Sequence, residues 1–218
     1  MLCARREAWL TESLSDMRAA GITVEGMLCD VAIPDQVQQV VDRTIETYGG
    51  VDILVNNAGV SWGERPEVMS LDKWRQVMDA NLTGAFLFAQ AAGRDMLTRQ
   101  KGCIINIGSI AATMSMVNGP HYAAYAASKA GLLGLTHELA ASWGRQGIRV
   151  NTISPGFFPS RLADPVIKLV EPDIKARSPI PRVGAPGELK GVAVFLASDA
   201  ASYITGQEIT VDGGLSHT

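Results

Sequence analysis

The sequence predicts an α/β fold, a doubly wound parallel sheet in one domain of 218 residues. Short apolar runs alternate with longer segments in which apolar residues recur every three or four positions, as in strands that alternate with helices. The short runs are apolar throughout, which is typical of strands buried on both faces. Hydrophobic residues make up 47% of the chain, enough to fill one core at this length, so we do not expect a second domain.

In the first half of the chain, glycines and prolines separate the two kinds of segment. Helical spacing predicts helices over 7–20 and 34–48 and one long helix from about Ser70 to beyond Phe86, and short apolar runs predict strands over 22–29 and 51–55. Gly21 and Gly49 end the first two helices, and Pro34 begins the second.

The second half continues the alternation with one irregular interruption. It predicts strands over 103–107, 149–153 and 207–211, and helices over 123–143 and 186–197. The segment 155–185 is rich in proline, and we expect only one short helix within it. Strand–helix alternation at this spacing favours parallel strands joined by right-handed crossovers.

Unusual residues follow three of the predicted strands directly. These are Asn56–Gly59, Gly108–Ser109 and Ser154–Gly156. In open parallel sheets, ligands bind outside the carboxyl ends of the strands. We therefore expect the three segments to line one crevice.

Tyr125 and Lys129 lie four positions apart on the helix predicted over 123–143, so their side chains share a face. The spacing alone is weak evidence and equally suits a solvated helix face. The preceding strand leads to Ser109, however, and a hydroxyl, a phenol and an ammonium group in one crevice form a plausible set for proton transfer. A cation close to a phenol favours the phenolate, which predicts a lowered pKa for Tyr125.

Six motifs occur in a fixed order along the chain. They are Asn56-Asn57-Ala58-Gly59, Asn81-Leu82-Thr83-Gly84, Ile107-Gly108-Ser109, Tyr125-x-x-x-Lys129, Arg149-Val150-Asn151-x-x-Ser154-Pro155-Gly156 and Gly206-Gln207-x-x-x-Val211-Asp212-Gly213-Gly214. Their order and spacing resemble the short-chain dehydrogenase/reductase family over essentially the whole chain. The resemblance implies a Rossmann-like fold and hydride transfer between a nicotinamide cofactor and a carbonyl or secondary alcohol.

The resemblance also implies four catalytic roles. Tyr125 matches the general acid/base, and Lys129 matches the residue that holds the nicotinamide ribose and lowers the phenol pKa. Ser109 matches the hydroxyl that positions the substrate carbonyl, and Asn81 matches the residue that anchors a proton-relay water at a helix irregularity. Taken singly, Ser109 would suit a loop cap and Asn81 a polar helix position without a role.

The resemblance further implies a set of cofactor-binding residues, which includes Tyr125 and Lys129 and otherwise comprises Arg5, Arg6, Asp30, Val31, Asn57, Ala58, Gly59, Pro155, Gly156 and Ser160. Asp30 matches the residue that meets the adenine, residues 57–59 pass the ribose, and Ser160 matches a contact to the carboxamide. Arg5 and Arg6 stand where an arginine suits a ribose 2′-phosphate, so NADP(H) is preferred, with NAD(H) as the alternative. Two solvated arginines at a helix start are the competing explanation.

The chain departs from the family pattern at its beginning. The first strand and the glycine-rich loop, T-G-x-x-x-G-x-G in the family, are absent from these residues, and Met1 falls within the expected second strand. We therefore expect the chain to be N-terminally incomplete. The first strand of this sheet order lies between the second and the fourth, so the sheet should show unpaired backbone and a slot there.

The substrate is expected under segment 157–185. Phe157 and Phe158 suit an apolar carbonyl compound, although lid packing explains them equally well. Segment 155–161 is similar to 3-oxoacyl reductases, so a 3-oxoacyl thioester is the first candidate, and a sugar acid such as gluconate is the second. A non-catalytic family member that acts as a binding or assembly partner is the third possibility. His121 could contact substrate, but a lone loop histidine is more often a surface residue.

Charge and composition limit the other partners. The 19 basic and 22 acidic residues form no run of one sign, so nucleic acid is not expected. No apolar stretch is long enough to span a membrane, and no signal peptide begins the chain, which predicts a cytoplasmic protein. The three cysteines lie far apart and suit reduced thiols, and neither they nor the histidines have metal-ligand spacing, so no metal is expected. The resemblance implies a homodimer or homotetramer.

Overall fold

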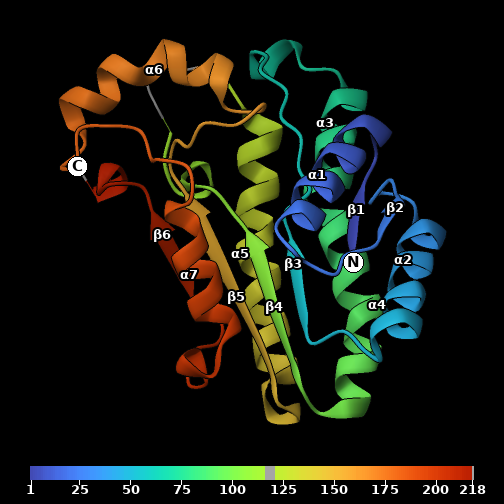
Figure 1. Ribbon diagram of the computed structural model, residues 1–218. Helices are drawn as coiled ribbons and strands as arrows, with labels where there is room; N and C mark the ends of the chain where they lie inside the picture. Colours follow the sequence, from blue (N-terminus) through green and yellow to red (C-terminus); the bar gives the residue numbers. More distant parts are fainter. Residues whose placement is uncertain (116–120, 218) are drawn as a thin grey trace.

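The computed structural model describes residues 1–115 and 121–217, and it has the α/β architecture that the sequence predicts (Figure 1). Its main sheet is parallel, in the order β3 (Ile53–Asn56), β4 (Gly102–Ile107), β5 (Ile148–Pro155) and β6 (Glu208–Val211). The strands β1 (Leu2–Ala4) and β2 (Gly26–Leu28) form a separate parallel pair. The parallel class is therefore confirmed, with the strands divided between two sheets.

The division falls at the place where unpaired backbone was expected. Within the described residues, β3 pairs with β4 alone and β1 pairs with β2 alone. The side chains of Ile53 and Val55 on β3 are each 48% exposed, which is unusual for apolar residues of a parallel strand. The expected interruption of the sheet is thus present between β1 and β3.

Helices cover both faces of the main sheet. The helices are α1 (Glu7–Ala19), α2 (Pro34–Tyr48), α3 (Leu71–Met78), α4 (Gly84–Arg99), α5 (Ala123–Trp143), α6 (Asp164–Arg177) and α7 (Glu188–Ala197). Successive β4 residues face opposite ways. Ile104 joins the core cluster beneath α4 and α5, whereas Ile105 joins the cluster beneath α7. None of the described helices is both long and apolar enough to cross a membrane.

Several element boundaries confirm the sequence analysis. The helix α2 begins at Pro34 and ends before Gly49, whose positive φ of 83° suits glycine. The helix α5 spans the 123–143 range that its periodicity predicts. These helices are well predicted because a breaker residue or a long periodic pattern marks them.

Three expectations about elements are wrong. The long helix after Ser70 is interrupted by a π-helical turn, Asp79–Thr83, that separates α3 from α4. The strand expected over 22–29 is only Gly26–Leu28. In the irregular segment, α6 is 14 residues long rather than short, because Ile167, Val170 and Ile174 form a buried stripe that continues past Pro172.

Candidate active site

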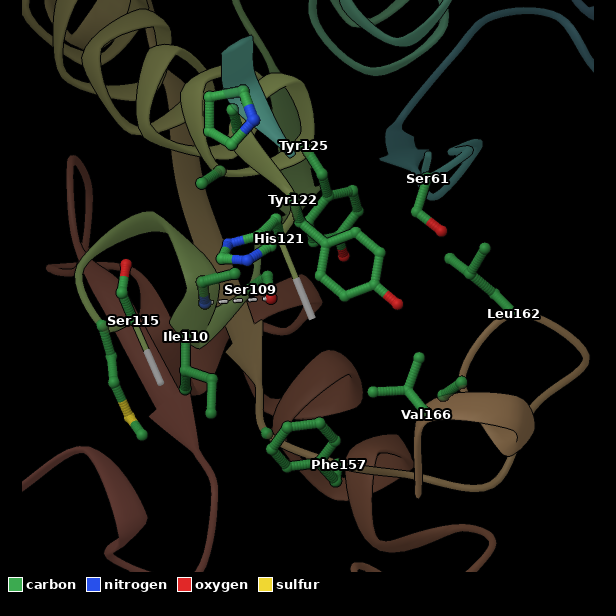
Figure 2. A pocket seen from close by; sticks show the side chains of 17 residues that line it. Ser61, Ser109, Ile110, Ser115, His121, Tyr122, Tyr125, Phe157, Leu162 and Val166 are labelled. Atoms are coloured by element: carbon green, nitrogen blue, oxygen red, sulfur yellow. Dashed lines mark hydrogen bonds between the residues drawn. The ribbon is translucent and has the colours of Figure 1, made fainter. Parts of the chain in front are cut away.

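A cavity of about 340 Å³ opens at the carboxyl ends of β4 and β5 (Figure 2). Ser109, which follows β4, and Gly156, which follows β5, both line it, together with Tyr125 from the first turn of α5. The expectation that separate strand ends meet at one crevice is confirmed for these two strands. The remainder of the lining comes from the segments that follow β3 and β4, from the start of α5, and from apolar residues between β5 and the first turn of α6.

Tyr125 and Ser109 both line this cavity. Ser109 is close enough to Tyr125 for its hydroxyl to act on the phenol and lower its pKa. The Ser109 hydroxyl also accepts a hydrogen bond of 3.1 Å from the backbone N–H of Ala111, so it caps the short turn after β4 as well. The Ser109 hydroxyl therefore caps the turn and belongs to the site at once, and its hydrogen bond from Ala111 fixes its position.

Lys129 lies one turn further along α5 and is buried, with 4% of its surface exposed. Its ammonium group donates a 2.6 Å hydrogen bond to the backbone oxygen of Ile107 and lies 5.7 Å from the ring centroid of Tyr125. Burial lowers the pKa of Lys129 to about 8. The solvated helix face that the spacing alone would suit is excluded.

The expected lowering of the Tyr125 pKa is wrong. Burial raises the pKa of this phenol, and the nearby Tyr122 raises it further, while the neighbouring Ser109 hydroxyl offsets only part of the rise. The cation that was expected to lower it points instead at the Ile107 backbone oxygen. Tyr125 is accordingly held as the neutral phenol in this structure.

Asn81 lies in the π-helical turn, as a residue at a helix irregularity should. Its side chain is 1% exposed and makes three hydrogen bonds. The amide oxygen accepts from the Val60 N–H at 2.8 Å, and the amide nitrogen donates to the Val60 oxygen and the Ser128 hydroxyl, each at 3.0 Å. Ser128 in turn donates to the backbone oxygen of Tyr125 at 2.7 Å. Asn81 thus connects the loop after β3 to the first turn of α5.

The loop after β3 passes close to this group. A Cβ atom on Gly59 would lie 3.4 Å from the Asn81 amide oxygen and 3.8 Å from the Lys129 ammonium nitrogen. The motif that contains Asn57, Ala58 and Gly59 is therefore next to Lys129, as the sequence analysis expects of cofactor-binding residues. On the opposite strand end, Gly156 packs so tightly on Asp212 that an added Cβ would lie 2.7 Å from the aspartate Cβ.

The other expected cofactor residues lie at the two-stranded sheet. Arg5, which follows β1, forms an ion pair of 3.8 Å with Asp30, which follows β2. Arg6 stacks on the Trp9 ring with its guanidinium carbon 4.3 Å from the centroid. Val31 packs against Gly84 at the start of α4, where an added Cβ would meet it at 2.7 Å.

Ser160 is placed differently from the other expected residues. It is exposed, its hydroxyl accepts from the Ala163 N–H at 3.1 Å, and its own N–H donates to the Asp164 carboxylate at 2.9 Å. These bonds order the turn that leads into α6. Ser160 is not among the described residues that line the cavity, although Pro155 ends β5 beside Gly156 as expected.

Sequence reasoning missed several residues of the cavity wall. Ser61, Met114 and Val166 carry no motif that would have marked them. Tyr122 had a usable signal, since it stands three residues before Tyr125 at the start of the same helix. His121 is exposed, as the surface interpretation expects, and it also lines the cavity, so the alternative of a substrate contact stays open.

The residues near Lys129 fit the ribose of a nicotinamide cofactor. An ammonium group carries three donors, and Lys129 uses one of them on the Ile107 oxygen within the described chain. A buried ammonium with donors to spare calls for further oxygen acceptors, such as ribose hydroxyls. The glycine at position 59 leaves backbone surface beside it that a larger side chain would cover.

The chain is similar to known proteins along most of its length. The family model described as enoyl-(acyl carrier protein) reductase matches residues 2–216. A D-threitol dehydrogenase of Mycolicibacterium smegmatis is 42% identical over 190 residues, which are 87% of this chain and 72% of that protein. A 3-oxoacyl-[acyl-carrier-protein] reductase of Synechocystis is 36% identical over 208 residues, 93% of this chain and 80% of the relative.

Solved structures include proteins with nearly the same fold. A gluconate 5-dehydrogenase from Burkholderia cenocepacia, solved in complex with NADP and tartrate, superposes with a TM-score of 0.93 at 34% identity, over 100% of this chain and 85% of that one. This enzyme and the two relatives are named as dehydrogenases and reductases. The chain belongs to the short-chain dehydrogenase/reductase family and is an oxidoreductase of the class that uses nicotinamide cofactors.

Proposed function

We propose that this protein interconverts a carbonyl compound and a secondary alcohol with NADP(H), and that Tyr125 is its general acid/base. The observation that carries the proposal is the convergence of three groups beside one cavity. Ser109 and Tyr125 line it, and Lys129 lies buried one turn further along α5, next to Gly59. A hydroxyl, a phenol and an ammonium group so arranged can orient a carbonyl and move a proton to it.

The bound nicotinamide supplies the hydride in reduction and accepts it in oxidation. In reduction, the Ser109 and Tyr125 hydroxyls hold the carbonyl oxygen, and Tyr125 donates its proton as negative charge develops there. The raised pKa of Tyr125 favours this direction, because the phenol keeps its proton at neutral pH. In oxidation, Tyr125 must first lose that proton. Binding of the cofactor and the alcohol would therefore have to favour the phenolate.

The role of Lys129 is to orient the cofactor, and it does not exchange protons with the substrate. Its hydrogen bond to Ile107 ties α5 to the end of β4, and its ammonium nitrogen lies close to Gly59 with two donors that this bond does not use. There they can hold ribose hydroxyls. Holding those hydroxyls would orient the cofactor beside the cavity that Tyr125 lines, where the proton is supplied.

A preference for NADP(H) over NAD(H) rests on Arg5 and Arg6. Arg5 is half exposed, and its partner Asp30 is 3.8 Å away, so its guanidinium remains free to meet a 2′-phosphate. The similar gluconate 5-dehydrogenase was solved with NADP, which supports the same choice. Arg6 stacks on Trp9, so it would add positive charge near the phosphate without contacting it directly.

A 3-oxoacyl thioester is the substrate that the cavity wall favours. Ile110, Met114, Phe157, Leu162 and Val166 line it, and none of the described lining residues is Asp, Glu, Lys or Arg. An acyl chain suits such a wall. A sugar acid of the gluconate type is the second candidate, supported by the solved gluconate 5-dehydrogenase, and its carboxylate would have to lie outside this wall.

Association into a homodimer or homotetramer forms part of the proposal. Large apolar side chains are exposed on the outer helices, with Leu71 at 58%, Phe86 at 41% and Val194 at 68%. Exposed apolar residues grouped on helices are typical of subunit interfaces. Sedimentation of the purified chain tests this point.

Titration of tryptophan fluorescence with NADPH, and separately with NADH, is the first test. Trp9 stacks on Arg6 and so reports on the proposed phosphate site. We expect tighter binding of NADPH, and oxidation of NADPH when a 3-oxoacyl thioester or a keto sugar acid is added. A chain that binds neither cofactor and turns over neither substrate would instead be the non-catalytic binding partner.

A further inference from the structure

Tyr122 stands at the front of the cavity, directly before α5. Its ring meets that of Tyr125 edge to face, with the centroids 6.3 Å apart and the planes at 65°. Figure 2 shows its phenol oxygen pointing into the cavity, on the side that Leu162 lines. A second phenol thus faces any substrate that reaches Tyr125.

The position of this ring is fixed by the segment that follows β3. Glu64 forms a β-bridge with Tyr122, and its N–H donates to the backbone oxygen of His121 at 3.0 Å. Gly63 lies against the ring, since an added Cβ would come within 3.0 Å of Tyr122 Cε1. The ring is therefore held from behind as well as by Tyr125, and its hydroxyl is preorganised.

The hydroxyl of Tyr122 has a hydrogen-bonding capacity that the protein leaves unused. Within the described residues, no backbone or side-chain group hydrogen-bonds it, and the wall facing it contains Leu162, Ala163 and Val166. Burial raises the pKa of Tyr122, so the group is a neutral phenol that can both donate and accept. A polar group held against an apolar wall gains most from a partner on the ligand.

We propose that Tyr122 is a specificity-determining residue, whose hydroxyl hydrogen-bonds a second oxygen of the substrate, away from the carbonyl that is reduced. This inference rests on the proposed function and deepens it. The uncharged lining indicates that this oxygen belongs to a neutral group. Two sources share that chemistry, the ester or thioester carbonyl of a 3-oxoacyl compound and the hydroxyl of a polyol-derived ketone.

Two matched pairs of ketones test the inference with NADPH as the reductant. The first pair is ethyl 3-oxobutanoate and 2-heptanone, and the second is 1,3,4-trihydroxybutan-2-one and 2-butanone. In each pair only the first compound carries further oxygens. The enzyme variants are Tyr122→Phe and the control Tyr203→Phe, which removes a phenol hydroxyl from a fully exposed side chain.

We expect Tyr122→Phe to lower kcat/KM about 10-fold for the oxygen-bearing ketone of at least one pair, and less than about twofold for its plain partner. The pair that responds identifies the source of the oxygen. Tyr203→Phe should change neither rate. A second variant, Gly63→Ala, keeps the hydroxyl but displaces the ring, and it should reduce the same discrimination.

The remaining outcomes overturn one proposal or the other. An equal loss for both members of a pair, or no loss in either pair, would show that Tyr122 has only a structural role or none. Melting curves that match the unmodified protein would confirm that the variants are folded. If the unmodified protein oxidises NADPH with none of the four ketones, the proposed function itself fails and this inference falls with it.

Discussion

At the scale of single residues, burial determines the protonation of the two central groups of the site. It raises the pKa of Tyr125 and lowers that of Lys129 to about 8, so both groups are shifted toward their neutral forms. A motif that places a cation near a phenol predicts the opposite shift for the tyrosine. The difference arises because the ammonium group is directed at the Ile107 oxygen, a contact that sequence spacing does not reveal.

Replacing Tyr125 with phenylalanine tests the proposed acid/base role. We expect kcat for NADPH-dependent reduction to fall by about 10²- to 10⁴-fold, because the proton donor is removed while the ring remains. Fluorescence titration should show NADPH affinity within about threefold of the unmodified protein, since the phenol contributes little of the cofactor contact. Retention of more than about a tenth of the activity would assign proton transfer to another group.

The pH dependence of reduction should follow Lys129. Below its pKa of about 8 the group is an ammonium that can hold ribose hydroxyls, and above that value it loses its charge and one donor. We therefore expect kcat/KM for reduction to be constant at lower pH and to decline as the pH rises through about 8. Tyr125, with its raised pKa, stays protonated through this range. A profile that stays flat well above this value would show that the charge on Lys129 is not needed.

Sequence motifs identified Tyr125, Lys129, Ser109 and Asn81, and the structure brings all four together, because ordered motifs record which strand ends and helix turns converge. The spacing of Tyr122 from Tyr125 was visible in the sequence, but the placement of its ring depends on a β-bridge to a residue 58 positions earlier in the chain, Glu64. Such contacts depend on tertiary packing and leave no local pattern.

At the scale of secondary-structure elements, the π-helical turn between α3 and α4 is the feature that periodicity missed. Apolar residues on both sides of it keep a helical spacing, so a sequence cannot distinguish the broken helix from a straight one. The extra residue in the turn directs Asn81 inward, where it hydrogen-bonds both backbone groups of Val60. Through these two hydrogen bonds, the π-helical turn holds the loop after β3 against the helices.

Replacing Asn81 with alanine tests the contribution of these hydrogen bonds. The Val60 N–H and the Ser128 hydroxyl would each lose a partner, which should cost about 1–3 kcal/mol in the free energy of unfolding. We also expect weaker NADPH binding, because Gly59 lies in the released loop. Urea denaturation and cofactor titration measure the two effects. Gln39→Ala, on the exposed surface of α2, is the control and should cost less than about 0.5 kcal/mol.

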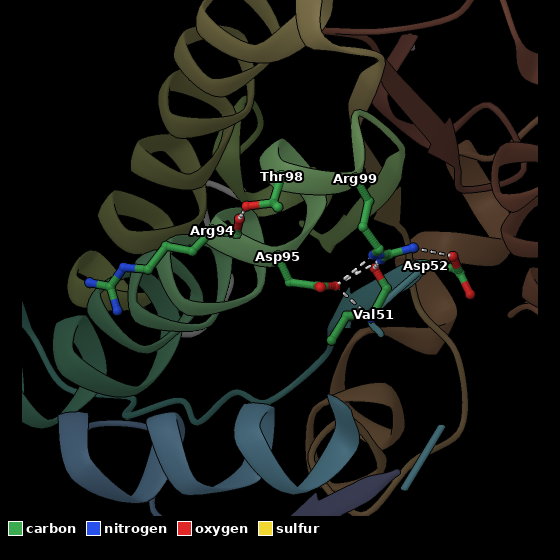
Figure 3. Close-up of polar contacts among 6 residues, drawn as sticks. All are labelled: Val51, Asp52, Arg94, Asp95, Thr98 and Arg99. Carbon is green, nitrogen blue, oxygen red and sulfur yellow. Dashed lines mark hydrogen bonds and ion pairs between the residues drawn. The ribbon is translucent and has the colours of Figure 1, made fainter. Parts of the chain in front are cut away.

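At the scale of the whole molecule, a charged cluster joins the helix layer to the start of the main sheet (Figure 3). The Asp95 carboxylate on α4 accepts from the Val51 N–H at 2.9 Å and forms a 2.8 Å ion pair with Arg99. Arg99 also pairs with Asp52 at 2.8 Å. The cluster sets where α4 sits on β3, and with it the distance between the π-helical turn and the strand end.

Asp95→Ala should destabilise the protein by about 2–3 kcal/mol, because the Val51 N–H loses its acceptor and Arg99 loses one of its two carboxylate partners. Asp52→Ala removes an exposed partner of the same arginine and should cost less than about 1 kcal/mol. Burial opposes ionisation of Asp95, but hydrogen bonds from Arg99 and the Val51 N–H outweigh it and lower the pKa below 3.8.

The sign of that shift predicts how the Asp95 contribution depends on pH. A carboxylate with a lower pKa in the folded state stabilises the fold above its unfolded pKa, and this stabilisation is lost as the pH falls through the folded value. The difference in stability between the unmodified protein and Asp95→Ala should therefore be constant near neutrality and shrink below about pH 4. A difference that persists undiminished in acid would assign the loss to packing.

The division into two sheets gives the proposed cofactor a structural role. Arg5 and Asp30 belong to the strand pair β1–β2, whereas Gly59 and Lys129 lie at the main sheet. A ligand that contacts both groups would hold the two sheets together and stabilise the folded state by about 2.7 kcal/mol at 100 times its dissociation constant. We expect NADPH to raise Tm more than NADH at equal concentration, because only NADPH carries the 2′-phosphate for Arg5. Arg5→Ala should lower NADPH affinity about 10-fold and remove this difference, leaving NADH binding unchanged, whereas an equal loss for both cofactors would mean that Arg5 contacts a part they share.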